Sequence, residues 1–387
     1  MTEANRLPPV YMRRNGFDPA PELGRIRESV GVHAVVSGLG TPAYLVTRYD
    51  DIKMALGDHE MFSNQPASVA DTEAGDLLAL DPPRHQRLRR MLTSEFTVRR
   101  MKQLEPRIIE IVDDSLGEME RNGPPSDLVS EFALPIPSLV ICELLGVPIS
   151  DRDEFQRRTG RQLDFSLPTS EHVKLAREAR SYMSKLVTGA RRDPGDDILG
   201  MLVRDHGDEL SDAELVGIAG LLLVAGHETT ANMLGLGALA LLRHPEQLAA
   251  VRDDPAAVVP AIEELLRWLS VVHTAIPRRT TSDVEIAGVC IPRGELVFFS
   301  LPSGNRDPDF VDAPDALDIG RDATGHLAFG HGVHHCLGAP LARMEMRVAF
   351  PALLQRFPGL HLAEPFDDVA FRPFHFIYGL QSLQVQW

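Results

Sequence analysis

Apolar residues recur at the spacing of a helix face along much of the chain. Between Gln103 and Arg121 they stand three or four positions apart, which predicts an amphipathic helix with one buried face. Further helices are predicted at 22–29, 49–56, 139–145, 171–186 and 337–357.

A longer apolar segment follows Ser211. Ser211 and Glu214 have the spacing of a capping box, in which each side chain bonds the backbone N–H of the other residue, so a helix is predicted to begin here. We expect this helix to run to about Arg243, just before Pro245. Because it is apolar on nearly every face, we expect it to be central and buried.

Short strands are predicted at 43–47, at 284–300 as two strands around the turn Pro292–Gly294, and within 369–387. The segments 63–76 and 302–325 have no period and are predicted to be loops. No repeat or Ser/Gly linker divides the chain. The pattern therefore predicts a mainly α fold with small β-sheets, in a single domain that spans residues 1–387.

The composition narrows the class of protein. The chain has 387 residues, with 55 acidic and 39 basic side chains and a net charge of −16, so nucleic acid and anionic lipid are poor candidate partners. Three cysteines, at 142, 290 and 336, argue against a disulfide framework. No signal peptide is evident, and the apolar run 215–226 is too short to span a membrane. We expect a cytoplasmic monomer.

The segment Phe329–Gly338, with the sequence FGHGVHHCLG, is the sharpest chemical signal. Its glycines allow a tight backbone to approach something large and flat. Cys336 directly precedes a predicted helix, whose N-terminal N–H groups and dipole favour a thiolate. A thiolate held in this way is a good axial ligand for haem iron.

Two other interpretations of this segment stay open. Cys336 could be an inert buried cysteine, as we assume for Cys142 and Cys290. Alternatively, a zinc ion could be bound by a set of four neighbouring side chains, His331, His334, His335 and Cys336. Structural zinc sites usually draw on two separated segments, and no second Cys/His pair is evident.

A second signal is the sequence AGHETT at 225–230, inside the long apolar helix. The Thr229 hydroxyl can bond back to the carbonyl of Ala225 and bend the helix, and Gly226 leaves room for a small ligand beside the bend. An acid and an alcohol together, Glu228 and Thr229, can relay protons. The alternative is a polar patch that faces a solvent channel or another helix.

A third signal is Glu264-x-x-Arg267, which places two opposite charges on one helix face. Taken alone it is more typical of an exposed ion pair, which contributes little to stability.

These three segments, in this order, resemble the cytochrome P450 family, and the resemblance covers about Tyr44 to Trp387. It implies that Cys336 is the proximal haem ligand and that Glu228 and Thr229 are the catalytic acid–alcohol pair. It also implies that Glu264 and Arg267 tie their helix to the aperiodic stretch before the cysteine loop, through Arg321.

The family resemblance also implies a clamp for the two haem propionates. The sequence DPPRHQRLR at 81–89 matches the family at His85 and Arg89, and PRRT at 277–280 matches it at Arg278, with Arg279 as the alternative. Charged or N–H donors of this kind suit carboxylates in a buried site. The implied cofactor-binding residues are His85, Arg89, Ala225, Gly226, Arg278, Phe329, Gly330, His334, Cys336 and Gly338.

The implied function is that of a haem-thiolate monooxygenase with haem b (iron protoporphyrin IX) as its cofactor. It would insert one oxygen atom of O2 into a hydrophobic small molecule, by hydroxylation or epoxidation, and a natural-product intermediate is the favoured substrate. Two alternatives are a peroxide-driven, coupling or dehydrating haem-thiolate enzyme, and a non-catalytic haem-binding sensor. By analogy with the family, the substrate pocket draws on 63–80, 155–182, Leu222, Ala225, 271–276 and 376–377.

The resemblance also implies redox partners, a ferredoxin and its NAD(P)H-dependent reductase. Between Arg84 and Lys102 the chain carries seven basic residues and one acidic residue, Glu95. Together with Arg343 and Arg347, this segment is the predicted docking face for a small acidic ferredoxin.

Overall fold

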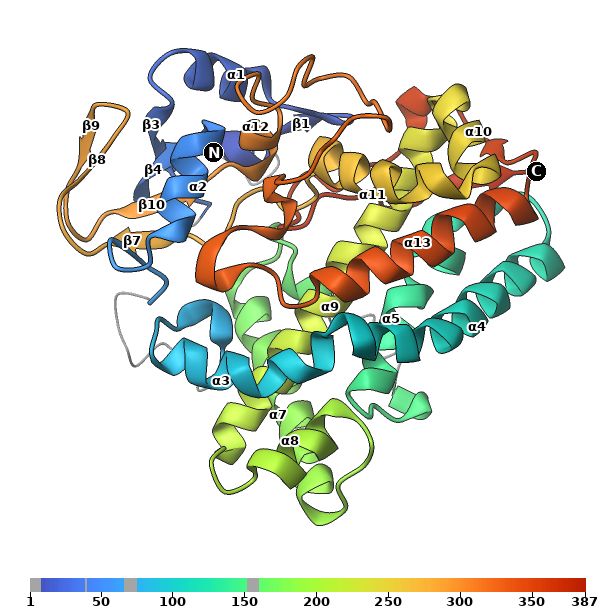
Figure 1. Cartoon of the computed structure of the whole chain (residues 1–387), viewed down its shortest axis with the longest axis horizontal. Coiled ribbons are helices and arrows are strands. Elements are labelled where there is room, and N and C mark those ends of the chain that lie inside the picture. The colour runs from blue at the N-terminus through green and yellow to red at the C-terminus, as the bar shows by residue number, and fades with distance from the viewer. Residues whose placement is uncertain (1–7, 39, 66–74, 152–159) are drawn as a thin grey trace.

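The structure is a computed structural model that describes residues 8–38, 40–65, 75–151 and 160–387 (Figure 1). It confirms a mainly α fold with small β-sheets. The longer helices are α1 (Pro21–Glu28), α2 (Tyr49–Gly57), α3 (Arg84–Thr93), α4 (Val98–Asn122), α5 (Pro135–Leu144), α7 (Thr169–Arg192), α8 (Ile198–His206), α9 (Asp212–Leu242), α10 (Pro245–Asp253), α11 (Pro255–Leu269), α12 (Leu301–Asn305) and α13 (Ala339–Arg356).

The strands are short and, within the described ranges, form four small sheets. They are β1 (Arg14–Asn15), β2 (Asp18–Pro19), β3 (Val32–Val36), β4 (Pro42–Val46), β5 (Phe62–Ser63), β6 (Ser126–Asp127), β7 (Arg278–Thr280), β8 (Val284–Ile286), β9 (Val289–Ile291), β10 (Leu296–Phe299), β11 (His361–Leu362) and β12 (Gln384–Gln386).

The largest sheet has five strands in the order β3-β4-β10-β7-β5. Its β4 and β10 run parallel, with Tyr44 opposite Val297, and the other neighbours are antiparallel. In Figure 1 the labelled strands of this sheet lie near α1 and α2 at one end of the molecule, and the long helices occupy the other. The segment 271–278 joins α11, among the long helices, to β7 of this sheet. It therefore lies between the helical region and the sheet.

Helix α9 is the central element, as predicted. Its capping box is present: the backbone N–H of Glu214 donates to Ser211 Oγ at 3.2 Å, and that of Ser211 donates to Glu214 Oε2 at 3.0 Å. Residues on almost every face of α9 are buried, and the helix packs against α5, α7, α11 and α13.

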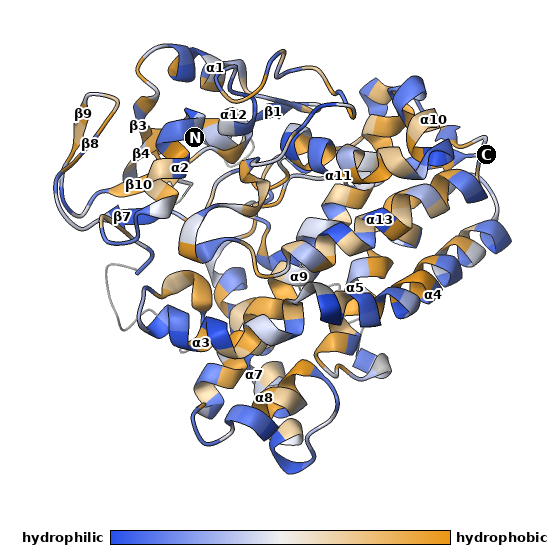
Figure 2. Cartoon of the chain, in the orientation of Figure 1, coloured by the Kyte–Doolittle hydropathy of each residue, from blue (hydrophilic) through white to orange (hydrophobic). Residues whose placement is uncertain are grey.

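The predicted helix at 103–121 is the central part of α4, which contains Pro106. Figure 2 shows hydrophilic and hydrophobic residues interspersed along α4, as expected for a helix with one buried face. That face, with Ile108, Val112 and Leu116, joins the main hydrophobic core around α5, α9 and α13.

The structure corrects several predictions of strands and loops. The segment 284–300 holds three strands instead of two, because a tight turn at Ala287–Gly288, both at positive φ, folds β8 onto β9 before β10 joins the large sheet. The predicted loop at 302–325 contains part of α12. Within 369–387 β12 is the only regular strand, and the other pairings are isolated bridges. Residues 66–74 of the predicted loop 63–76 lie outside the described residues.

Candidate functional site

A cavity of about 450 Å³ lies beside the middle of α9, and most of its lining surface is apolar. Its walls come from α3, α9, the segment 271–278, the cysteine loop with the first part of α13, and the turn at Phe376–Ile377. Most of the predicted pocket segments contribute to it. From 155–182, however, the described contributor is Leu163, and residues 155–159 lie outside the described part of the chain.

The cysteine loop presents Cys336 to this cavity. The Cys336 backbone N–H donates to the carbonyl of Phe329 at 2.9 Å, which closes the loop. Gly330 and Gly332 have positive φ, and a Cβ at Gly332 would lie 2.5 Å from the carbonyl oxygen of Leu56, so glycine is required there. Phe329, Gly330, Cys336 and Gly338 all line the cavity, as does Ala225 of α9.

The helix N-terminus favours a thiolate at Cys336, as predicted, but burial acts against it. Burial raises the pKa of the Cys336 thiol above its ordinary value. The backbone N–H groups of Gly338 and Ala339 and the charges of Arg89 and Arg343 act in the opposite direction, but they do not outweigh burial. A cationic metal centre facing the sulfur would supply the missing stabilisation of the thiolate.

The other interpretations of this segment receive no support. Among the described residues no three His, Cys, Asp or Glu side chains are grouped so that they could hold a metal ion, which disfavours the zinc site. Cys142 is buried in the core, as assumed. The same assumption is wrong for Cys290, which is exposed on β9 of the β8–β9 hairpin.

Four side chains of the predicted propionate clamp, His85, Arg89, Arg278 and His334, line one cavity. The centres of the His85 and His334 rings lie 4.1 Å apart. Arg89 Nη2 donates to the carbonyl of His335 at 2.6 Å, so α3 is tied to the cysteine loop. Arg278 lines the cavity, whereas Arg279 Nη1 donates to Gly294 O at 2.9 Å and lies outside it.

The clamp fits a buried group that carries carboxylates. Burial and neighbouring cations lower the pKa of His85 to about 4 and that of His334 to about 3, so both rings are neutral N–H donors at pH 7. Burial lowers the pKa of Arg278 to about 10, which leaves it protonated. Buried nitrogens of His85, Arg278 and His334 have no hydrogen-bond partner among the described residues. The two cations, Arg89 and Arg278, and the unpaired N–H donors could therefore bind two carboxylate groups of a cofactor in this cavity.

The predicted acid and alcohol of α9 are placed on different sides of the helix. Thr229 lines the cavity, and its Oγ1 donates to the carbonyl of Ala225 at 3.0 Å, as predicted. Glu228 is 2 % exposed and faces away from the cavity. The two side chains therefore do not form a contacting pair, and proton transfer between them needs an intermediate carrier.

Glu228 has partners that the sequence did not indicate. Its Oε2 lies 3.5 Å from Arg372 Nη1 and 3.3 Å from Asn232 Nδ2, and its Oε1 lies 3.6 Å from His227 Nε2. Glu228, Asn232 and Arg372 border a second, much smaller cavity of about 10 Å³, which is room for about one water molecule. No local motif marks Arg372, which lies in the C-terminal segment.

Gly226 lines the cavity, but packing is what requires a glycine at this position. A Cβ there would lie 2.9 Å from two side-chain carbons of Ile141 on α5. Gly226 therefore leaves room on the cavity side, as expected, and it also lets α5 and α9 pack closely.

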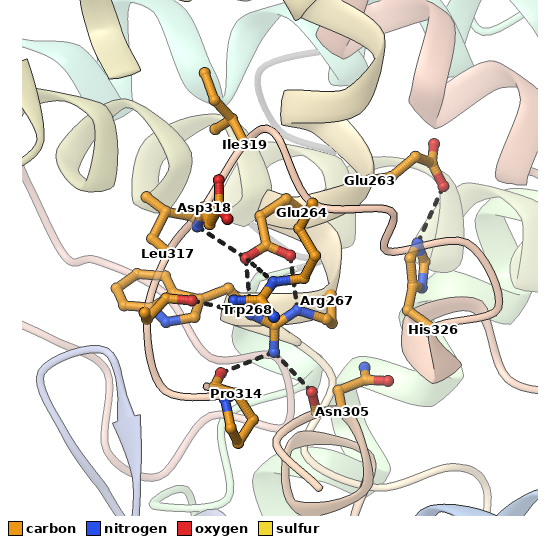
Figure 3. Close-up of polar contacts among 12 residues, drawn as sticks. Glu263, Glu264, Arg267, Trp268, Asn305, Pro314, Leu317, Asp318, Ile319 and His326 are labelled. Carbon is orange, nitrogen blue, oxygen red and sulfur yellow. Dashed lines mark hydrogen bonds and ion pairs between the residues drawn. The ribbon is translucent and has the colours of Figure 1, made fainter. Parts of the chain in front are cut away.

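The Glu264–Arg267 pair is fully buried, so the exposed-pair interpretation is wrong (Figure 3). Arg267 Nε and Nη2 lie 2.7 and 2.8 Å from the two Glu264 oxygens, and Glu264 Oε1 also lies 3.3 Å from Arg321 Nε, as the family resemblance implied. Arg267 Nη1 donates to the carbonyls of Asn305 and Pro314 at 2.8 and 2.9 Å. The pair thus ties α11 to the segment that precedes the cysteine loop.

Comparisons with known proteins agree with this geometry. The cytochrome P450 family model matches residues 22–163 and 166–364. Cytochrome P450 FAS1 of Rhodococcoides fascians is 49 % identical over 98 % of both chains, and the mycinamicin IV hydroxylase/epoxidase of Micromonospora griseorubida is 41 % identical over the full length of both. The crystal structure of CYP105P1 in complex with filipin I superposes with a TM-score of 0.93, at 38 % identity over 99 % of each chain.

No helix in the described part of the chain is both long and apolar enough to cross a membrane.

Proposed function

Because the chain belongs to the cytochrome P450 family, whose cofactor is haem b, we propose that Cys336 supplies the axial thiolate to the haem iron. The protein is a monooxygenase of this family. The observation that carries the assignment is the position of Cys336, which faces a cavity that also contains the four-residue clamp. Bound haem would supply the iron centre at which dioxygen is activated.

The clamp would hold the haem by its propionates. Arg89 and Arg278 supply positive charge, and the neutral rings of His85 and His334 supply N–H donors. The two arginines also offset the charge that two carboxylates bring into a buried site. The same cavity is lined by Phe329, Gly330, Gly338, Ala225 and Gly226, which would help to hold the cofactor.

We propose that the substrate is a medium or large, mainly hydrophobic molecule. Most of the side chains that line the cavity away from the clamp are apolar. They come from α9, the segment 271–278 and the C-terminal turn, and include Leu221, Leu222, Ile276, Phe376 and Ile377. One relative is named for the hydroxylation and epoxidation of mycinamicin IV, and a natural-product intermediate is the substrate class that we propose for this chain.

A panel of hydrophobic natural products tests this proposal. A substrate that displaces water from the iron shifts the Soret band of the ferric protein, so binding can be read without turnover. Product analysis with a ferredoxin, its reductase and NADPH then distinguishes hydroxylation or epoxidation from coupling. Turnover that proceeds with peroxide but not with the redox partners would indicate a peroxide-driven enzyme, and no turnover with any binder would indicate a sensor.

Thr229 is proposed to hold a hydroxyl beside the site of oxygen activation, and Glu228 to move protons towards it from the side of Arg372 and the small cavity. Oxygen activation consumes two protons, and a positioned hydroxyl can pass them on through a hydrogen bond. Because Glu228 faces away from the main cavity, water or a side-chain rotation must complete the path.

Replacing Thr229 by alanine is expected to uncouple oxygen consumption from product formation. The thiolate spectrum and NADPH consumption should stay largely intact, while oxygen is diverted to hydrogen peroxide. By analogy with an oxyanion-hole donor, which contributes ~2.7–4 kcal/mol to a transition state, loss of the Thr229 hydroxyl should lower product per NADPH severalfold or more. Product and peroxide are measured together with a productive substrate. Full coupling in Thr229→Ala would show that the Thr229 hydroxyl is not needed for oxygen activation.

Replacing Glu228 by glutamine should instead slow turnover, because the carboxylate is proposed to move protons.

Bacterial members of this family receive electrons from a ferredoxin and its reductase, and we propose that the docking face includes the exposed basic side chains of α3 and the start of α4. The structure refines the predicted set. Arg87 and Arg100 are paired with Glu214 and Glu95, and Arg343 is paired with Glu263. Among the described residues no ion pair engages the basic side chains of Arg84, Arg90, Arg99, Lys102 and Arg347.

Reversing the charge of Arg90 and Arg99 to glutamate is expected to slow reduction by ferredoxin severalfold, because the long-range attraction that brings the two proteins together is lost. In the unmodified protein, the reduction rate at sub-saturating ferredoxin should fall steeply as salt is added. Arg25→Glu on α1, which lies well away from α3 in Figure 1, is the matched control. Reduction that is independent of salt and of both reversals would place the docking face elsewhere.

A further inference from the structure

A second acidic side chain of α11, next to the Glu264–Arg267 pair, binds the cysteine-loop region. Glu263 accepts two hydrogen bonds from Arg343 of α13: Arg343 Nε lies 2.6 Å from Oε1, and Nη2 lies 2.7 Å from Oε2. His326 Nε2 lies 3.2 Å from the same Oε2. Figure 3 draws this contact between Glu263 and His326. Burial raises the pKa of Glu263, but the bonds from Arg343 and His326 lower it to about 2, so the carboxylate is charged at any working pH.

This ion pair reaches Cys336 through Phe329. The Arg343 guanidinium lies 4.5 Å from the centre of the Phe329 ring, in a cation–π contact. His326 Nδ1 accepts the backbone N–H of Ala328 at 3.1 Å, which fixes the residue before Phe329. The carbonyl of Phe329 in turn accepts the backbone N–H of Cys336 at 2.9 Å. One chain of contacts therefore runs from α11 to the backbone of Cys336.

The geometry of Arg343 suits this role. Its Nε and Nη2 edge is used by Glu263, which leaves the flat face of the guanidinium free to stack on the aromatic ring. A lysine at 343 could offer one charge but could not make both the two-pronged bond and the stacked contact. Arg347 on the same helix is exposed and has neither partner: its Nη2 lies 3.6 Å from the Met344 sulfur.

We propose that Glu263 and Arg343 are positioning residues that hold Phe329 against the cysteine loop and thereby set the reduction potential of the metal centre that Cys336 binds. Residues that orient a ligand from outside the coordination sphere tune its donation to the metal, and donor orientation around a thiolate is one of the levers on potential. The proposal rests on the ligation by Cys336 proposed above. In this proposal Arg343 acts on the cysteine loop, so Arg343 is not part of the ferredoxin docking face.

The test compares Glu263→Gln, Arg343→Lys and Arg343→Gln with Arg347→Gln as the matched control. The reduction potential of the substrate-free holoprotein and the position of its ferrous carbon monoxide band are measured. Both Glu263→Gln and Arg343→Lys should change the equilibrium constant for one-electron reduction about tenfold (about 59 mV), in the same direction. The double variant Glu263→Gln/Arg343→Gln should shift the reduction potential no further than either single change, because each single change already breaks the same ion pair. Arg347→Gln should leave the reduction potential unchanged.

The contrary results are specific. A wild-type potential in both Glu263→Gln and Arg343→Lys would overturn the proposal. A second pattern would also overturn the proposal: the reduction potential shifts in opposite directions in Glu263→Gln and Arg343→Gln, the shifts cancel in the double variant, and Arg343→Lys has no effect. That pattern would show that the charges act on the metal centre through space and not by positioning Phe329. If Glu263→Gln does not retain haem, the Arg343→Lys result decides. Failure of the ligation itself is seen separately, as the absence of the thiolate band in the unmodified protein.

Discussion

Replacing Cys336 by histidine is expected to abolish the red-shifted Soret band that the ferrous carbon monoxide complex of a thiolate-ligated haem shows, and monooxygenation with it. Cys336 lines the main cavity, and its backbone N–H is fixed by Phe329. Imidazole is a neutral ligand and does not push electron density onto the iron as a thiolate does, so cleavage of the O–O bond loses its main support. The measurement is the difference spectrum of the reduced protein with and without carbon monoxide.

Cys142→Ser and Cys290→Ser are the matched controls, because neither cysteine lines the main cavity. Cys290 is exposed on a hairpin, so its substitution should also leave stability unchanged. Cys142 is fully buried in the core, where a serine hydroxyl is costly to bury, so Cys142→Ser should lower stability but keep the band. A thiolate band that survived in Cys336→His, or disappeared in either control, would contradict the assignment.

Local rules predicted the central helix and the cysteine loop correctly. The capping box of Ser211 and Glu214 and the apolar run that follows are contained in one short segment, so the start of α9 needed no tertiary information. The glycines before Cys336 likewise indicate a tight loop in which side chains would clash. At Gly332, for example, an added Cβ would lie too close to the carbonyl oxygen of Leu56.

Features that depend on distant segments could not be predicted in this way. One charged partner of Glu228 is Arg372, from a different part of the chain, and nothing in the sequence around either residue joins them. The pKa of Cys336 depends on how much protein surrounds the sulfur, whereas the sequence shows only the helix that follows it. The spacing of Glu264 and Arg267 is the same in an exposed and in a buried pair, so burial had to come from the fold.

Replacing Arg267 by methionine is expected to cost ~3–5 kcal/mol of folding free energy, which is a large part of the stability of a typical domain. Methionine fills much of the volume but removes the buried cation that binds both Glu264 oxygens, which leaves Arg321, at 3.3 Å, as the remaining charged partner. The carbonyls of Asn305 and Pro314 also lose their donor, so the segment that leads to the cysteine loop loses its link to α11. Urea unfolding of the holoprotein, followed by both the Soret band and far-ultraviolet circular dichroism, measures the loss.

Arg252→Met is the control for this experiment, because Arg252 makes a similar two-pronged pair with Asp253 that is open to solvent. Water screens that pair, so its loss should leave unfolding almost unchanged. Replacing both buried partners, in Glu264→Met/Arg267→Met, should recover part of the lost stability because the buried carboxylate that lost its main cation is removed as well. Recovery should be incomplete, since the carbonyls still lack a donor. An unfolding midpoint for Arg267→Met equal to that of the unmodified protein would show that the fold does not depend on this link.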